Sequence, residues 1–156
     1  MDPGSLQAGR TGRGRVAGDE EPEGGGRPLP LIALEFRRPD LGRLRRRVAS
    51  CAAEAGLRGM RLQSFVMAVN EIVTNAVIHG GGLGRLRLWH AGRQLVCEIS
   101  DAGPGIPDGR MPAGRPPVEA TSGRGLWLTR TLCDAVSLET GRQGTTVRLA
   151  AGLDSA

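Results

Sequence analysis

One apolar helical stretch carries side chains that could do chemistry. The segment FVMAVNEIVTNAVIHGGG, residues 65–82, places Glu71, Asn75 and His79 at intervals of four residues. Residues four apart lie on one face of an α-helix, about 6 Å from each other along its axis. These three side chains therefore form a polar edge on a helix whose other sides are apolar, and such a helix presents its polar edge to a cavity.

The residue types on this edge fit phosphate chemistry. An Asn oxygen is a hard neutral ligand suited to Mg²⁺, which keeps several waters and takes further oxygens from phosphates. Glu71, one turn before Asn75, could accept a proton from a hydroxyl group or a water near the same phosphate. The polar face of an ordinary amphipathic helix would show the same spacing. We assign no chemistry to His79, which suits a packing role at the helix end.

Two glycine motifs later in the chain could hold a nucleotide. SDAGPGIP places Asp101 at a strand end, followed by Gly103 and Gly105. A carboxylate there can accept a hydrogen bond from an exocyclic amine such as that of adenine, and glycines let a base and a ribose approach the backbone closely. A simple turn capped by an aspartate is the structural alternative.

The second motif, SGRGLWL, sets Gly123 and Gly125 at the expected start of a helix. Free amides and the helix dipole favour phosphate at such a position. Arg124, or Arg115 in the preceding segment, could add a charge-assisted contact to phosphate. A glycine that merely caps the helix is the alternative.

The elements that position these residues follow from periodicity and turn signals. We expect strands over 31–37, 84–92, 93–101, 135–140 and 144–150, and helices over 41–55, from about 60 to 79, and over 123–136. The Gly- and Pro-rich segment 102–121 between them is expected to form a lid. This order predicts an α/β (α+β) two-layer sandwich, with helices on one face of a mixed, mostly antiparallel sheet.

Composition and charge limit the architecture and the partners. A chain of 156 residues that is 39% hydrophobic suits one ordinary domain. All the basic residues are arginine; residues 1–30 hold four Arg against five Asp and Glu (net −1), so the remainder holds 17 against 11 (net +6). The basic charge therefore belongs to the folded part, where the arginines of helix 41–55 form either a solvated face or a surface for an acidic partner.

The remaining features concern domain limits and location. Residues 1–28 are rich in Gly, Arg, Pro and Glu and are expected to be a disordered tail, which leaves 29–152 as the folded domain. Cys51, Cys97 and Cys133 are far apart, which favours small core residues over disulfides or a zinc site. No apolar run reaches the roughly 18–20 residues of a membrane span, and no secretory signal is evident. We therefore expect a cytoplasmic protein.

The order of the motifs is more specific than any one of them. ExxxN on a helix, DxGxG after a strand, a Pro/Gly lid, GxG opening a helix and a closing GTT strand resemble the nucleotide-binding motifs of the GHKL ATPases. This superfamily includes gyrase B and the histidine kinases, and the resemblance covers about residues 31–150. It implies the Bergerat ATP-binding fold.

Within that superfamily, the small size, the stretch EIVTNAVIHGG and the closing GTTVRL are most similar to the anti-sigma factor serine kinases of the sporulation and general stress switches. That resemblance implies a domain that binds ATP and Mg²⁺ and holds a sigma factor. It also implies phosphorylation of a serine on a STAS-domain anti-anti-sigma protein, and a homodimer as the working form.

The same resemblance implies a role for each matching residue. Glu71 would be the general base that activates the partner's serine, and Asn75 would coordinate Mg²⁺. The nucleotide itself would be held by residues of the later motifs: Asp101 at adenine N6, Gly103 and Gly105 along the base pocket, Gly123 and Gly125 at the phosphates, and Thr145 beside the adenine.

Two other functions remain open at this stage. A non-catalytic module that binds ATP and sequesters a transcription regulator would use the same pocket. Nucleic-acid binding through RRPDLGRLRRR, residues 37–47, is the third reading. The lack of Tyr and the presence of only two Phe and two Trp argue against it, because little is left for base stacking.

Overall fold

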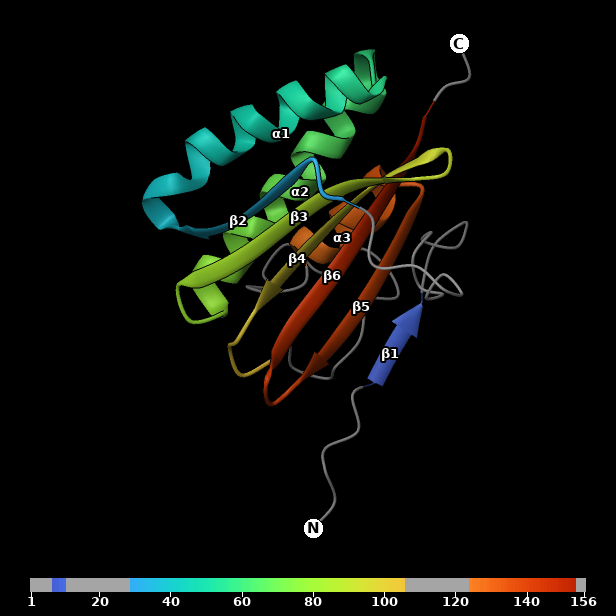
Figure 1. The fold of residues 1–156 in the computed structure, drawn as a ribbon. Helices are drawn as coiled ribbons and strands as arrows, with labels where there is room; N and C mark the ends of the chain where they lie inside the picture. The colour runs from blue at the N-terminus through green and yellow to red at the C-terminus, as the bar shows by residue number, and fades with distance from the viewer. Residues whose placement is uncertain (1–6, 11–28, 106–123, 154–156) are drawn as a thin grey trace.

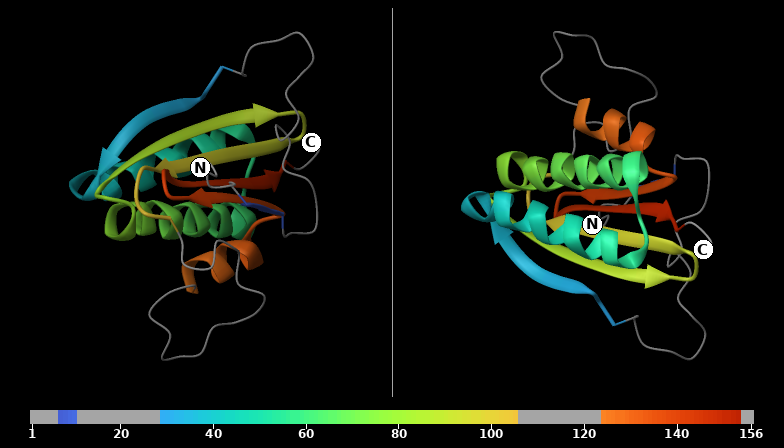
Figure 2. Two further views of the ribbon diagram at one scale, coloured as in Figure 1. Left: turned by 90° about the horizontal axis from the view of Figure 1, so that it is seen from below. Right: turned by 90° about the horizontal axis from the view of Figure 1, so that it is seen from above.

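One antiparallel sheet with three helices on one of its faces forms the described part of the molecule (Figures 1 and 2). The computed structural model describes residues 7–10, 29–105 and 124–153. The sheet has six strands in the order β1-β5-β6-β4-β3-β2. The strands are β1 (Gln7–Arg10), β2 (Ile32–Arg37), β3 (Leu83–Ala91), β4 (Gln94–Asp101), β5 (Ala135–Gly141) and β6 (Gly144–Gly152).

Local hydrogen bonds and glycines set the ends of the helices. A short 3-10 turn, Arg38–Asp40, follows β2, and the Asp40 carboxylate accepts the Arg37 backbone N–H at 2.8 Å. Helix α1 (Leu41–Ala55) starts directly after this turn and ends at Gly56, whose φ of 117° is the left-handed conformation that glycine adopts readily. Helix α2 (Gly59–His79) and helix α3 (Arg124–Leu132) complete the layer.

The core lies between the helices and the inner face of the sheet. Alternate residues of the strands point inward, as the period of two requires. They meet the apolar sides of α1 and α2, which contribute Leu44, Val48, Phe65, Val69 and Ile72. Because α2 crosses beneath the middle strands with its apolar sides buried, its polar edge is held in a fixed position relative to the sheet.

A polar clasp fixes the beginning of α2 against the end of β6. The Asp134 carboxylate accepts hydrogen bonds from the Arg61 guanidinium at 2.8 Å and from the Gly152 backbone N–H at 2.6 Å. Arg61 also donates to the Gly152 carbonyl at 2.5 Å. The three groups thereby connect a helix and a strand that lie far apart in the sequence.

Most of the predicted architecture is confirmed. The two-layer sandwich is present, and each expected helix and strand that lies in the described residues exists with similar limits. Every pairing between described strands is antiparallel, so the expected mixture does not occur there. The proposed helix over 123–136 ends earlier, at Leu132, because the chain from Ala135 onward pairs with β6 as β5.

Four residues of the expected tail form a strand in the structure. Gln7–Arg10 form β1, which adds to the outer edge of β5, although this stretch has little apolar content. Backbone hydrogen bonds to an exposed strand edge require no apolar side chains, so composition does not reveal such a pairing. The other residues of the expected tail, and most of the expected lid, lie outside the described residues.

The cysteines behave as core residues. All three are free thiols; Cys97 is buried, and Cys51 and Cys133 are partly buried against the main core. Burial, with a smaller contribution from Asp134, raises the pKa of Cys133 to about 12, so its reactive thiolate is not populated at neutral pH. None of the described helices is long and apolar enough to cross a membrane.

A glycine on β3 makes room for a core aromatic ring and yields a stability prediction. Gly84 pairs with Phe36 of β2, and a Cβ on Gly84 would lie 2.7 Å from two carbons of the Phe36 ring. Because Phe36 is 1% exposed, its ring cannot swing outward. We expect Gly84→Ala to lower the free energy of unfolding, measured by urea denaturation, by about 1–3 kcal/mol.

The matched control is Gly42→Ala on α1, where an added Cβ has no atom within 4 Å. This change should raise the free energy of unfolding by about 0.5–1 kcal/mol, because alanine is the better helix former. Equal effects of the two substitutions would contradict the packing described for Gly84.

Candidate functional site

The polar edge of α2 lies where the core meets solvent. Glu71 and Asn75 are partly buried, and His79 is exposed at the end of the helix. On the adjoining side, Ile72 and Ala76 are each 3% exposed and pack in the core. The carboxylate and the amide are therefore held by a rigid helix yet remain open to a ligand.

The end of α2 is in direct contact with the end of β4. The Gly80 N–H donates to the Ala76 carbonyl at 3.0 Å and terminates the helix. A Cβ on Gly80 would lie 2.6 Å from Asp101 Oδ2, and a Cβ on Gly103 would lie 2.6 Å from Gly80 Cα. Two glycines thus face each other across this junction, and any larger residue at either position would separate helix from strand.

Asp101 is the charged group of the junction. It is the last residue of β4, and its Oδ1 accepts the Gly103 backbone N–H at 2.9 Å. Desolvation by burial raises the pKa of Asp101, although hydrogen bonds from the Gly103 and Thr145 backbones act in the opposite direction. The carboxylate is therefore incompletely compensated, and a ligand that donates a hydrogen bond to it would offset part of this desolvation.

The β5–β6 hairpin closes the other side of the junction. Thr145 pairs with Asp101 in the sheet, is 8% exposed, and shares a 2.8 Å hydrogen bond with the Thr140 hydroxyl. Gly105 has φ 91°, and a Cβ there would lie 2.6 Å from the Gly141 carbonyl oxygen. The chain that leaves β4 therefore passes tightly over the end of the hairpin.

These contacts revise the reason for the glycines of the DxGxG motif. The sequence interpretation assigned them to close approach of a base and a ribose. In the structure, Gly103 and Gly105 allow close approach of the protein's own backbone, at Gly80 and at Gly141. Whether a nucleotide also lies against them stays a prediction.

The site extends along the helix from this junction. Asn75 and Glu71 precede Gly80 by five and nine residues, which correspond to about 7.5 and 13.5 Å of helix axis. The order along the site is therefore a half-buried carboxylate, an amide oxygen and a second carboxylate. This order fits an elongated ligand that has hydrogen-bond donors at one end and phosphates at the other.

The structure brings together only part of the predicted set. Asp101, Gly103, Gly105 and Thr145 meet at the junction, and Glu71 and Asn75 lie on the helix that ends there. Arg124 and Gly125 are the first described residues of α3, and α3 packs beside α2 (Figure 2). Arg115 and Gly123 lie outside the described residues.

Three residues of the junction were not singled out from the sequence. Gly80 was interpreted only as a helix stop, and Thr140 as part of a strand. Gly144 belongs to the GTT motif; it has φ 138°, and a Cβ there would overlap the Asp101 carbonyl oxygen. Glycines at the ends of helices and strands were the available signal in the sequence, but they do not indicate which other segment of the chain packs against them.

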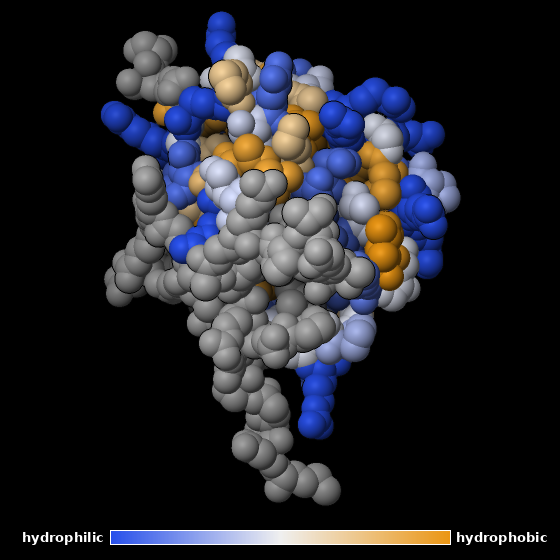
Figure 3. Space-filling model, turned by 180° about the vertical axis from the view of Figure 1, so that it is seen from behind, coloured by the Kyte–Doolittle hydropathy of each residue, from blue (hydrophilic) through white to orange (hydrophobic). Residues whose placement is uncertain are grey.

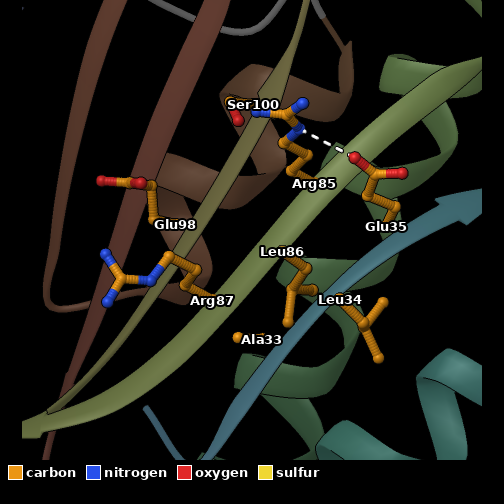
Figure 4. Close-up of a pocket in the computed structure, with 8 residues that line it drawn as sticks. All are labelled: Ala33, Leu34, Glu35, Arg85, Leu86, Arg87, Glu98 and Ser100. Atoms are coloured by element: carbon orange, nitrogen blue, oxygen red, sulfur yellow. Dashed lines mark hydrogen bonds and ion pairs between the residues drawn. The ribbon is translucent and has the colours of Figure 1, made fainter. Parts of the chain in front are cut away.

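A hollow on the opposite face of the sheet contains none of the predicted residues (Figure 4). It has a volume of about 360 Å³ and is lined by residues of β2, β3 and β4. Its charges alternate: Arg85 pairs with Glu35 at 3.2 Å, and Glu98 pairs with Arg148 at 2.7 Å. Because these charges pair with one another, the hollow has little net charge to attract an anionic ligand. The junction at Asp101, in contrast, has a partly desolvated carboxylate that can accept a hydrogen bond from a ligand.

Comparison with known families agrees with the geometry of the junction. Residues 34–151 match the family of histidine kinase-like ATPase domains. The chain belongs to this family. Membership in the histidine kinase-like ATPases implies ATP binding, and the matched span contains every described residue of the site. No individual curated protein matches the chain.

The residues present fit an adenine nucleotide. Asp101 supplies a desolvated acceptor for the adenine amine, and the start of α3 supplies backbone amides of the kind that bind phosphate. Asn75 supplies one neutral oxygen on α2, the helix that contacts both β4 and α3. The fit therefore rests on the donor and acceptor types and on their order along α2.

The acceptor role of Asp101 yields a test that separates binding from folding. Asp101→Asn keeps an oxygen for the Gly103 N–H but places an amide group where the adenine amine would donate. We expect ATP affinity, measured by calorimetry, to fall at least about tenfold, the effect of one lost charge-assisted hydrogen bond.

The thermal midpoint of Asp101→Asn should stay close to that of the wild type, because the smaller desolvation penalty of a neutral amide offsets the weaker hydrogen bonds that it accepts from the Gly103 and Thr145 backbones. Unchanged ATP affinity in a folded variant would remove Asp101 from the site.

Proposed function

We propose that this protein is an Mg²⁺-dependent serine protein kinase that also acts as an anti-sigma factor. Its substrate would be a serine of a STAS-domain anti-anti-sigma protein, and its action would control release of the sigma factor. The observation that carries the proposal is that α2, which bears the partly exposed Glu71 and Asn75, ends in direct contact with the desolvated carboxylate of Asp101.

The chemistry needs few protein groups. Phosphoryl transfer depends on positioning and on stabilisation of charge more than on covalent chemistry by the protein. Asn75 would hold Mg²⁺ together with waters and phosphate oxygens, as this ion prefers. Glu71, one turn further from the junction, would accept the proton of the incoming serine hydroxyl.

Partial exposure of Glu71 supports a macromolecular substrate. A carboxylate sealed in the core could serve only water or a small molecule, whereas the edge of α2 can be approached from outside. The arginines of α1 are exposed on the same layer and would favour an acidic partner such as the proposed sigma factor.

Substitutions on the α2 edge test the assignment of roles. With ATP, Mg²⁺ and STAS-domain proteins of the same organism, Glu71→Ala should reduce phosphorylation by at least about a hundredfold while ATP binding is largely retained. Asn75→Ala should instead lose the Mg²⁺-dependent part of ATP binding. Intact-mass analysis of the partner and calorimetry with and without Mg²⁺ make the two measurements.

Undiminished phosphorylation by Glu71→Ala would refute the role of this residue as general base. Absence of phosphoserine on a STAS-domain partner that the wild type demonstrably binds would favour the sequestration module instead.

A further inference from the structure

Strand β1 joins the sheet from outside the segment that matches the ATPase family. The family match covers residues 34–151, whereas β1 is Gln7–Arg10. It pairs with the outer edge of β5 and forms one end of the six-stranded sheet, as Figure 1 shows. This chain therefore adds a strand of its own to the family domain, beside the hairpin that closes the junction.

One cross-strand row of the sheet connects β1 with the candidate site. Gln7 pairs with Thr140 of β5, and Thr140 pairs with Thr145 of β6. Thr145 in turn pairs with Asp101 of β4. Neighbouring strands lie about 4.8 Å apart, so the backbones of Gln7 and Asp101 are about 14 Å from each other along this row. The backbone of β1 is thus three strands away from the acceptor carboxylate.

The end of β5 reaches the junction through two contacts. The Thr140 hydroxyl shares a 2.8 Å hydrogen bond with the Thr145 hydroxyl, and the Thr145 backbone donates to the Asp101 carboxylate. A Cβ on Gly105 would lie 2.6 Å from the Gly141 carbonyl oxygen. A shift of this end of β5 would therefore displace groups that bond to Asp101 and the chain that follows it.

Strand β1 holds the end of β5 from its outer side. Among the described strands, β5 pairs with β6 along one edge and with β1 along the other. The β1 pairing covers Ser137 to Thr140, the part of β5 next to its last residue, Gly141. Without β1 this part would be an exposed edge beside a hairpin turn, where backbone pairing opens most easily.

We propose that β1 is a positioning strand for the nucleotide site: its pairing with β5 holds Thr140 in place and, through Thr145, the groups around Asp101. Nucleotide affinity then depends on a segment outside the family domain. By thermodynamic linkage, a bound nucleotide stabilises the β1–β5 pairing by the same factor by which the pairing raises affinity. The inference rests on nucleotide binding at the junction, which the test measures separately.

The test uses the full chain and two variants changed at the same positions of β1. The strand-breaking variant combines Ala8→Pro and Gly9→Pro, because proline has no N–H to donate to a neighbouring strand. The conservative variant combines Ala8→Ser and Gly9→Ala, which keep both N–H groups. Thermal melting checks that each variant is folded.

We expect the strand-breaking variant to bind ATP with Mg²⁺ at least about fivefold more weakly than the wild type, the lower end of couplings between sites. The conservative variant should bind as the wild type does. Calorimetry measures these affinities. In hydrogen exchange followed by NMR, ATP should slow the exchange of β1 amides in the wild type by a factor similar to the loss of affinity.

Thr140→Val tests the route of the coupling, because it removes the hydroxyl and leaves β1 unchanged. This change should weaken ATP binding in the wild-type background and have little further effect in the strand-breaking background, since both interrupt the same link. Fully additive losses would overturn the route through Thr140.

Equal ATP affinities of the strand-breaking variant and the wild type would overturn the inference, as would an equal loss in the conservative variant. If the strand-breaking variant keeps its affinity but self-associates in analytical ultracentrifugation, β1 merely covers an edge. The helical side, where hydrophobic residues lie among hydrophilic ones (Figure 3), is unchanged in these variants and would not explain that difference. A folded wild type that binds no ATP would refute the nucleotide site itself, and this inference with it.

Discussion

The close approach of α2 to the end of β4 is the constraint on which the site depends. A Cβ on Gly80 would collide with Asp101, and a Cβ on Gly103 would collide with Gly80. A Cβ on Gly144 would likewise collide with the backbone of Asp101. Contact at this point sets the carboxylate of Asp101 beside the end of a rigid helix. It thereby brings Asp101 to the end of the helix that carries Asn75 and Glu71.

The junction also holds one carboxylate, that of Asp101, in an electrostatically unfavourable position. Asp101 keeps a carboxylate in a partly desolvated position, and two backbone N–H groups only partly offset the rise in its pKa. Groups held in this way are common at binding sites, because a ligand supplies the hydrogen bond that the protein leaves unmade. The surrounding structure supports the arrangement through the core beneath α2 and through the Arg61–Asp134 clasp at the other end of that helix.

Much of this structure could be predicted from the sequence. Helical and alternating periodicities predicted α1, α2 and β2 through β6, because burial of one face imposes those periods. The family resemblance assigned both Asp101 and Thr145 to the adenine, and the structure pairs these two residues in the sheet. What periodicity could not predict was contact between segments. Strand β1 pairs through its backbone alone, and the role of Gly80 depends on Asp101 and Gly103, which follow it by more than twenty residues.

The most direct test of the junction as the nucleotide site is an NMR titration of ATP with Mg²⁺ into the ¹⁵N-labelled wild-type protein. The structure predicts that amide signals of Asn75, Asp101, Gly103 and Thr145 shift together and saturate at one concentration, while those of β2 and of the outer sheet face stay in place. Saturable binding that leaves the Asp101 and Gly103 signals unchanged, or that shifts only residues around Arg85 and Arg87, would contradict this account.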